Sequence, residues 1–238
     1  MAEPKYKRVV LKLSGEQFQG ERNAGIDAEF LHWIAGEVKK AVAEGTQIII
    51  IVGGGNFVRG ASFSNHGIER TTADYMGMLA TIMNGMALTD VLEQNGQPTR
   101  LMTRLGASSV AEPYIRRRAL RHMEKGRVVF IAGGTGNPYV TTDTASVLAA
   151  SELAADAVLK ATKVDAVYDK DPAKHDDAKK FETLSMTEAL ENDQIMVMDK
   201  AALAMALEQK LPIVVFGLMD EGNIARVVSG EDVGTLVS

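Results

Sequence analysis

The stretch VVFIAGGTGNPYVTTDTA, residues 128–145, joins an apolar run to an alanine-rich segment through a loop that contains three glycines, an asparagine and a proline. The run VVFIA is long enough for a strand that is buried on both faces. Two threonines and then Asp143 follow the loop, which is typical of a helix N-terminus. The stretch therefore predicts a strand, a loop whose backbone amides a ligand can approach, and a helix, in that order.

Five further apolar runs predict five more strands. They are RVVLKL (8–13), QIIIIV (47–52), TRLMT (99–103), AVLKA (157–161) and PIVVF (212–216). Helical patterns lie between the runs. The first expected helix is capped by Asp27 and ends at Gly45, and the second runs from about 72 to 95 and ends at Gly96. A third has Pro113 in its first turn and ends at Gly126. A fourth starts with a capping box of Ser185 and Glu188, and a fifth runs from Asp199 to Gln209. This alternation predicts an α/β fold with a mostly parallel sheet covered on both faces, and ligands bind such sheets at the carboxyl ends of the strands.

The helix expected from about 72 to 95 is rich in methionine. We expect one side of it to be buried, namely the side with Met76, Leu79, Met83, Met86 and Val91. Its methionines exceed what one buried stripe needs, and adaptable apolar side chains also suit packing against a partner subunit. The alternative is that all of them belong to the core.

Composition narrows the class of protein. Of the 238 residues, 46% are hydrophobic and 24% charged, as in an ordinary soluble globular protein. A net charge of −5 and an acidic pI of about 5.5 argue against a nucleic-acid partner held through its phosphates. The chain has no cysteine, which excludes disulfides and thiolate chemistry. It shows neither the apolar core of a signal peptide nor an apolar run of about 20 residues, so we expect a cytoplasmic protein without a membrane segment.

The loops after the first two strands have residues suited to phosphate. Lys12 interrupts an apolar strand just before Gly15, where a compact ammonium can neutralise a phosphoryl group that is being transferred. An edge lysine that prevents sheet pairing is the alternative, although it does not explain the adjacent Ser-Gly. Three glycines at 53–55 let backbone amides approach an anion, and Arg59 adds a planar donor group. We favour phosphate binding over a bare turn for this loop.

The loop within 132–145 combines several donors. Its glycines expose amides, Asn137 offers a donor and an acceptor to a base edge, and Thr141 and Thr142 stand where a helix N-terminus favours an anion. Asp143 either complements the helix dipole or holds a phosphate network that contains magnesium. After the fifth strand, Thr162, Tyr168 and Asp171 are spaced for the base, sugar and phosphates of a nucleotide, within a hydrophilic block (168–183) that is either a solvated excursion or a ligand-covering loop.

Standard catalytic motifs are missing. The chain has no G-x-x-x-x-G-K-[ST], no strand-anchored G-x-G-x-x-G, no H-E-x-x-H and no G-x-S-x-G, and its four histidines lack ligand spacing. Two phosphate-type loops without a P-loop suggest a different kind of kinase. Such an enzyme works mainly by positioning and charge stabilisation and needs no protein nucleophile.

At this point the chain resembles the bacterial-type uridylate (UMP) kinases of the amino acid kinase family over nearly its whole length. The motifs that carry the resemblance are KLSGE (12–16), GGGNFVRG (53–60), DYMGMLAT (74–81), AGGTGNPYVTTD (132–143), KATKVDAVYDKDP (160–172), VMDKAA (197–202) and LPIVVF (211–216). The resemblance implies a three-layer α/β/α sandwich, formed as a single domain with a UMP-binding part at roughly 1–155 and an ATP-binding part at roughly 156–238. It also implies ATP-dependent conversion of UMP to UDP with Mg²⁺, and a homohexamer that GTP activates and UTP inhibits.

The resemblance assigns individual residues as well. The ATP-binding set is Lys12, Leu13, Ser14, Gly15, Gly55, Arg59, Thr162, Tyr168 and Asp171. The UMP-binding set is Gly54, Asp74, Thr135, Gly136, Asn137, Pro138, Tyr139, Val140, Thr141 and Thr142. Lys12, Arg59, Asp143 and Asp199 form the catalytic set, and no protein metal ligand is assigned. Arg100 and Arg127 take the place of effector contacts, and GERNAG (20–25) takes the place of the GTP-responsive loop.

Two alternatives compete with a UMP kinase. A relative that phosphorylates carbamate, glutamate or acetylglutamate has no base for Asn137 and no ribose for Asp74 to contact. A non-enzymatic binding protein of the same fold, like the molybdenum-storage subunits, has no need for Lys12, Arg59 and Asp143 together.

Overall fold

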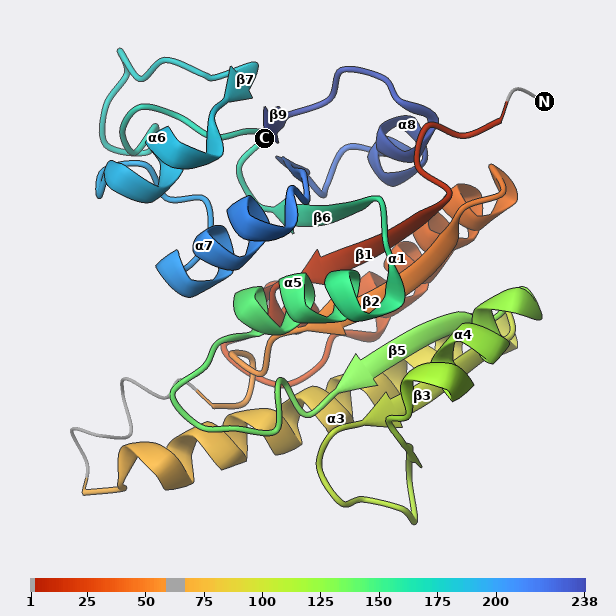
Figure 1. Cartoon of the computed structure of the whole chain (residues 1–238). Coiled ribbons are helices and arrows are strands. Elements are labelled where there is room, and N and C mark those ends of the chain that lie inside the picture. Colours follow the sequence, from red (N-terminus) through yellow and green to blue (C-terminus); the bar gives the residue numbers. More distant parts are fainter. Residues whose placement is uncertain (1–2, 59–66) are drawn as a thin grey trace.

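The computed structural model describes residues 3–58 and 67–238, and its centre is a twisted, mostly parallel sheet (Figure 1). In the described ranges the sheet has nine strands in the order β4-β3-β5-β2-β1-β6-β8-β9-β7. Their bounds are β1 (Arg8–Leu13), β2 (Gln47–Val52), β3 (Thr99–Thr103), β4 (Glu112–Pro113), β5 (Val128–Ala132), β6 (Ala157–Thr162), β7 (Thr183–Leu184), β8 (Ile213–Gly217) and β9 (Thr235–Val237). Only the β8–β9 pair is antiparallel among the strand pairs of the described residues. The six predicted strands are confirmed.

Helices cover both faces of the sheet. The helices are η1 (Gly15–Gln19, a 3₁₀ helix), α1 (Ala28–Ala43), α3 (Arg70–Gln94), α4 (Arg116–Glu124), α5 (Thr142–Leu153), α6 (Met186–Glu191), α7 (Lys200–Gln209) and α8 (Asn223–Ser229). One apolar cluster joins α1, α3 and α8 to the sheet, and a second joins α4, α5, α6 and α7 to its other face. In Figure 1, α4 and α5 lie in front of the strands and α1 lies behind them. The predicted three-layer α/β/α sandwich is confirmed.

Successive side chains of each strand belong alternately to the two apolar clusters. On β1, Val9 and Leu11 pack on the face of α1 and α8, whereas Val10 packs on the face of α5 and α7. All three are fully buried. This is why the strands read as continuous apolar runs, since successive side chains point to opposite, equally covered faces.

Polar side chains start the helices where the sequence predicts them. Asp27 accepts a hydrogen bond from the backbone N–H of Phe30 at 3.0 Å, and Asp199 accepts one from Ala202 at 2.8 Å. Ser185 accepts one from the N–H of Glu188 at 3.1 Å. Such caps satisfy orphan backbone donors and each stabilises a helix by about 1 kcal/mol.

Two expectations about helices are wrong. Pro113 lies in the edge strand β4, where its missing N–H costs nothing, and α4 begins only at Arg116. On α3, the residues expected to be buried include Leu79 and Met83, which are 53% and 49% exposed. Val91 is buried as expected, and Ile82, Leu88 and Leu92 join it in the core. Gly85 lets the helix approach the sheet closely, since a Cβ there would lie 2.6 Å from Leu101 Cδ1 and 2.9 Å from Phe130 Cε1.

Candidate active site

The carboxyl ends of β5, β2, β1 and β6 meet at one edge of the sheet, because these four strands are neighbours and run parallel. The loops that follow β1 and β2 touch there. A Cβ on Gly15 would lie 2.5 Å from the carbonyl oxygen of Gly53 and 2.6 Å from the N of Gly55. The two loops therefore pack backbone against backbone, and the partly exposed glycines at 53–55 suit the close approach of phosphate oxygens.

Buried amides hold the second glycine loop in place. Asn84 on α3 donates a hydrogen bond to the carbonyl oxygen of Gly53 at 2.9 Å and pairs with Asn56 at 2.8 Å. Both asparagines are almost fully buried. Gly54 packs against α3, since a Cβ on it would lie 2.4 Å from the carbonyl oxygen of Gly77. These contacts fix the loop before any ligand arrives.

An ion cluster lies beside the glycine loops. Lys12 Nζ is 2.7 Å from Asp143 Oδ1, and Lys160 Nζ is 3.0 Å from Asp143 Oδ2. The three side chains are only 11%, 17% and 14% exposed for Lys12, Lys160 and Asp143. Lys160 was not predicted as a site residue. The interpretation of Lys12 as an edge lysine is wrong, because β1 lies between β2 and β6 in the middle of the sheet.

Charge and burial compete in this cluster. Burial raises the pKa of the Asp143 carboxyl, but the ammonium groups of Lys12 and Lys160 outweigh burial and bring that pKa below its ordinary value. Burial lowers the pKa of Lys160; Asp143 opposes this shift, and the like charge of Lys12 adds to it, so the pKa of Lys160 lies below that of an ordinary lysine. Asp143 Oδ1 is buried, and its close partner is the Lys12 ammonium at 2.7 Å.

Asp199 connects the loop before α5 to α7. Besides capping α7, its carboxylate accepts hydrogen bonds from the hydroxyls of Thr141 and Thr144, the latter at 3.0 Å. Thr141 itself caps α5 by accepting from the N–H of Asp143 at 3.0 Å. Asp199 therefore holds the loop that leads to Asp143.

The predicted UMP loop folds against α3. The backbone N–H of Tyr139 donates to Asp74 Oδ2 at 2.7 Å, and the Tyr139 hydroxyl lies 3.4 Å from Thr71 Oγ1. Tyr139 has a φ of 66°, a strained left-handed conformation for a residue with a side chain, and Asp74 is the acceptor that supports it. Arg70 pairs with Asp74 at 3.1 Å. Asp74 and the loop of residues 135–142 are thus parts of one site.

Three of the predicted ATP residues line a cavity of about 380 Å³ next to Lys160 of the ion cluster. Thr162, Tyr168 and Asp171 contribute to its wall together with Lys160 and Met196. Ser14 begins η1, and its N–H donates to Gln17 Oε1 at 2.8 Å. The Leu13 side chain is fully buried, which leaves only its backbone for a ligand. Arg59 lies outside the described residues.

The predicted effector arginines lie at the opposite edge of the sheet, near the amino ends of β3 and β5. Arg100 is 3.1 Å from Glu93 and 3.8 Å from Glu112, and Arg127 Nη1 is 2.9 Å from His122 Nδ1. His122 Nε2 is in turn 3.3 Å from Glu112 Oε2. One polar network therefore joins the two arginines, away from the glycine loops.

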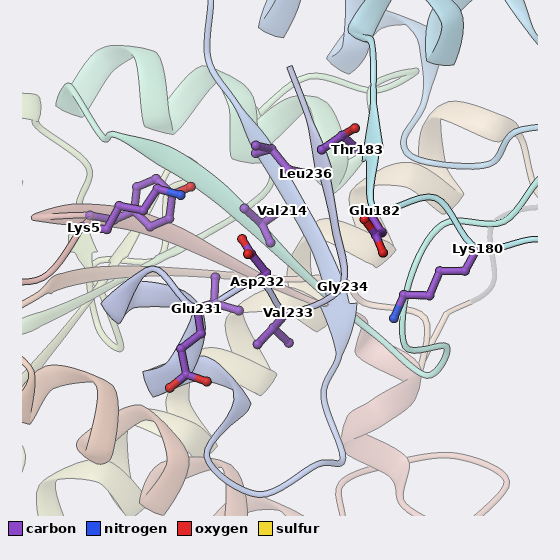
Figure 2. Close-up of a pocket in the computed structure, with 12 residues that line it drawn as sticks. Lys5, Lys180, Glu182, Thr183, Val214, Glu231, Asp232, Val233, Gly234 and Leu236 are labelled. Atoms are coloured by element: carbon purple, nitrogen blue, oxygen red, sulfur yellow. The ribbon is translucent and has the colours of Figure 1, made fainter.

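A larger cavity of about 510 Å³ lies elsewhere, beside β8 and β9 (Figure 2). Lys5 and Lys180 lie on opposite sides of it, with Val214 and Leu236 between them. None of the predicted site residues lines it. Size alone does not mark the site of phosphate chemistry in this protein.

Comparison with known proteins agrees with this arrangement. The sequence matches the amino acid kinase family over residues 7–217. The chain belongs to that family. The structure is similar to a UMP kinase from Bacillus anthracis, with 39% identity, a TM-score of 0.94 and coverage of 98% of this chain and 96% of that one. It is also similar to a UMP kinase from Ureaplasma parvum (30% identity, TM-score 0.91, 98% and 99% covered) and to a uridylate kinase from Archaeoglobus fulgidus (28%, 0.76, 97% and 99%).

The chain is thus a kinase of the amino acid kinase family with a structure like those of UMP kinases. Among the described residues, no helix is both long and apolar enough to cross a membrane. In that same part of the chain, no group of three or more histidine, aspartate and glutamate residues could hold a metal ion.

Proposed function

We propose that the protein transfers the γ-phosphoryl group of ATP to UMP and forms UDP in pyrimidine nucleotide biosynthesis in the cytoplasm. The observation that carries this proposal is the position of the Lys12–Asp143–Lys160 cluster. It lies between the loop of residues 135–142 with Asp74 on one side and the cavity with Thr162, Tyr168 and Asp171 on the other. Two nucleotides bound in these places bring their phosphates to the buried ammonium groups.

The chemistry needs no protein nucleophile. A phosphate oxygen of UMP attacks the γ-phosphorus directly, a new P–O bond forms, and the bond to the β-phosphate oxygen breaks with its electron pair on ADP. Lys12 neutralises the charge on the transferred group, and the amides of the two glycine loops orient the phosphates. Asp143 holds Lys12 in place, and Asp199 holds the loop that leads to Asp143.

Magnesium fits this site as a partner of ATP. Mg²⁺ is commonly held by one or two carboxylates together with substrate phosphates and water. Asp143 is the carboxylate beside the two phosphate positions, but it already pairs with Lys12 and Lys160, so the ion would be held mainly by the phosphates of ATP and by water. Bound there, the ion would neutralise charge on the phosphates.

We propose that the two nucleotides bind mainly to different parts of the chain. Residues 1–155 supply the UMP side, including Gly54, Asp74 and residues 135–142, and also the phosphate contacts of ATP at 12–15, Gly55 and Arg59. Residues 156–238 supply the rest of the ATP side through Thr162, Tyr168 and Asp171. On the UMP side, Asn137 reads the pyrimidine edge. A panel of acceptors tests whether UMP is the substrate: purified protein with ATP and magnesium should phosphorylate UMP and leave glutamate, acetylglutamate and carbamate untouched. Turnover of an acid without UMP turnover would assign the protein to another member of its family.

Regulation and assembly complete the proposal. The exposed side of α3, with Leu79, Met83 and Met86, is the surface through which we expect subunits to pair within a homohexamer. GTP as activator and UTP as inhibitor bind near Arg100 and Arg127, whose shared network lies at the edge of the sheet away from the reacting phosphates.

A further inference from the structure

Arg104 lies against the start of the loop expected to bind UMP. It directly follows β3, and its backbone N–H donates a hydrogen bond to the carbonyl oxygen of Ala132, the last residue of β5, at 3.1 Å. Gly136 is close to it, since a Cβ on Gly136 would lie 3.6 Å from both the Cβ and the carbonyl oxygen of Arg104. A Cβ on Gly133 would lie 3.2 Å from the backbone N of Arg104. The first turn of the loop therefore packs against this residue.

The side chain of Arg104 ends in a partly buried cluster with Glu152 and Tyr114. Arg104 Nη2 and the Tyr114 hydroxyl both donate to Glu152 Oε2, the latter at 2.7 Å. The guanidinium carbon of Arg104 lies over the Tyr114 ring, 4.2 Å from its centroid, which adds a cation–π contact. Burial and the hydrogen bond to Glu152 raise the pKa of the Tyr114 hydroxyl, so it remains a donor at neutral pH. The Arg104 side chain is only 15% exposed, so water weakens this ion pair less than it weakens a pair on the surface.

The cluster joins three elements that are far apart in the sequence. Arg104 follows β3, Tyr114 follows β4, and Glu152 lies in the last turn of α5. Helix α5 begins at Thr142, where the loop of residues 135–142 ends. Arg104 therefore contacts the start of the loop with its backbone and the helix that follows the loop with its guanidinium group.

The loop has few strong contacts of its own to keep it in one conformation. Its three glycines, at 133, 134 and 136, have positive φ values of 81°, 56° and 81°. Glycine loses more conformational entropy on ordering than any other residue. The hydrogen bonds between Thr135 and Asn137 are long, at 3.3 and 3.4 Å. A loop of this kind binds a ligand more tightly when a neighbouring residue orders it before the ligand arrives.

We propose that Arg104 is a positioning residue for UMP, which holds the loop of residues 135–142 in its binding conformation through Glu152 and Tyr114. This inference rests on the proposed function, in which that loop binds UMP. Arg104 acts through the loop and not on the reacting atoms. Its loss should therefore weaken UMP binding and leave the ATP side unchanged, because β5, β2 and β1 separate β3 from β6, the strand that leads to the ATP cavity.

Single variants of the ion pair test this role. Arg104→Met removes the charge and keeps most of the side-chain length, Glu152→Gln removes the carboxylate and keeps its shape, and Arg117→Met, at an exposed arginine of α4, is the matched control. If the loop is ordered for only about a tenth of the time, UMP binds about tenfold more weakly, which corresponds to 1.4 kcal/mol. We expect this change in the KM for UMP, and in its dissociation constant by calorimetry, for both ion-pair variants. Their kcat at saturating UMP and their KM for ATP should match those of Arg117→Met.

The double variant Arg104→Met, Glu152→Gln tests whether the two residues act as one pair. If they do, the double variant binds UMP about as weakly as either single variant, because the second substitution removes nothing further. Losses that multiply to about 100-fold would show that the two residues act independently. That result would contradict a role of Arg104 through Glu152.

Hydrogen exchange of the protein without nucleotides separates this inference from the proposed function. Amides of residues 133–142 should exchange faster in Arg104→Met and Glu152→Gln than in Arg117→Met, whereas amides of β2 should exchange equally in all three, which shows that the fold is intact. If the wild type neither binds nor phosphorylates UMP, the proposed function fails, and the exchange of residues 133–142 still tests whether Arg104 holds the loop. Ion-pair variants with the loop exchange and UMP affinity of Arg117→Met would overturn the assignment. A lower kcat with an unchanged KM for UMP would overturn it as well.

Discussion

Replacing Asp143 by asparagine should damage both stability and catalysis, because one carboxylate joins two buried ammonium groups at 2.7 and 3.0 Å. Removing one partner of a buried ion pair costs about 3–5 kcal/mol, and the asparagine oxygen still accepts one hydrogen bond, so we expect about 3 kcal/mol. Urea unfolding at pH 7 measures this loss. With Lys12 and Lys160 no longer held in position by a carboxylate, kcat should also fall about 100- to 1000-fold.

The pH dependence of this loss has a definite sign. The pKa of Asp143 is lower in the folded protein than in the unfolded chain, so its stabilisation is present above the unfolded value of about 3.9 and is lost as the pH falls through the folded value. The difference in unfolding free energy between wild type and Asp143→Asn should be constant near neutral pH and shrink below about pH 4. Asp193→Asn, which removes an exposed carboxylate paired with Lys200, is the matched control and should have no measurable effect. Equal unfolding free energies and equal kcat values for both variants would refute the reasoning.

Three further predictions concern separate parts of the molecule. Lys12→Ala should lower kcat about 100- to 1000-fold, and steady-state kinetics showing an unchanged kcat would exclude Lys12 from charge stabilisation. Met83→Glu places a charge on the exposed apolar side of α3, so light scattering should show a smaller assembly than the wild type, and an unchanged mass would move the interface elsewhere. The double variant Arg100→Ala, Arg127→Ala should lose the effect of GTP on the UMP dependence of the rate while keeping the rate without GTP. Calorimetry that finds the same GTP affinity in both proteins would place the effector site elsewhere.

Most of the fold could be predicted from the sequence, because strands buried on both faces read as continuous apolar runs with clear ends. QIIIIV (47–52) is confirmed residue for residue as β2. The short strands β7 and β9 were not predicted, since two or three residues carry no periodicity. Helix α3 was placed correctly, but its buried side only in part: Val91 is buried as predicted, whereas Leu79 and Met83 are exposed and Ile82, Leu88 and Gly85 face the sheet instead.

The candidate site could be predicted where a residue type was unusual in its local sequence. Lys12 was recognised because it interrupts an apolar strand, and AVLKA (157–161) places Lys160 in the same pattern, a signal that was available but not used. The link between them could not be predicted. Asp143 contacts Lys12 and Lys160, and Thr144 contacts Asp199, only because of the strand order and helix packing, which no local pattern encodes.

The initial rate of UDP formation from UMP, measured with ATP and magnesium beside AMP and dCMP as alternative acceptors, tests the central claim most directly. The account predicts rapid consumption of ATP with UMP and little with AMP or dCMP, because it assigns Asn137 to the pyrimidine edge and Asp74 to a ribose hydroxyl. Absence of UDP formation, or equal rates with UMP and AMP, would contradict it.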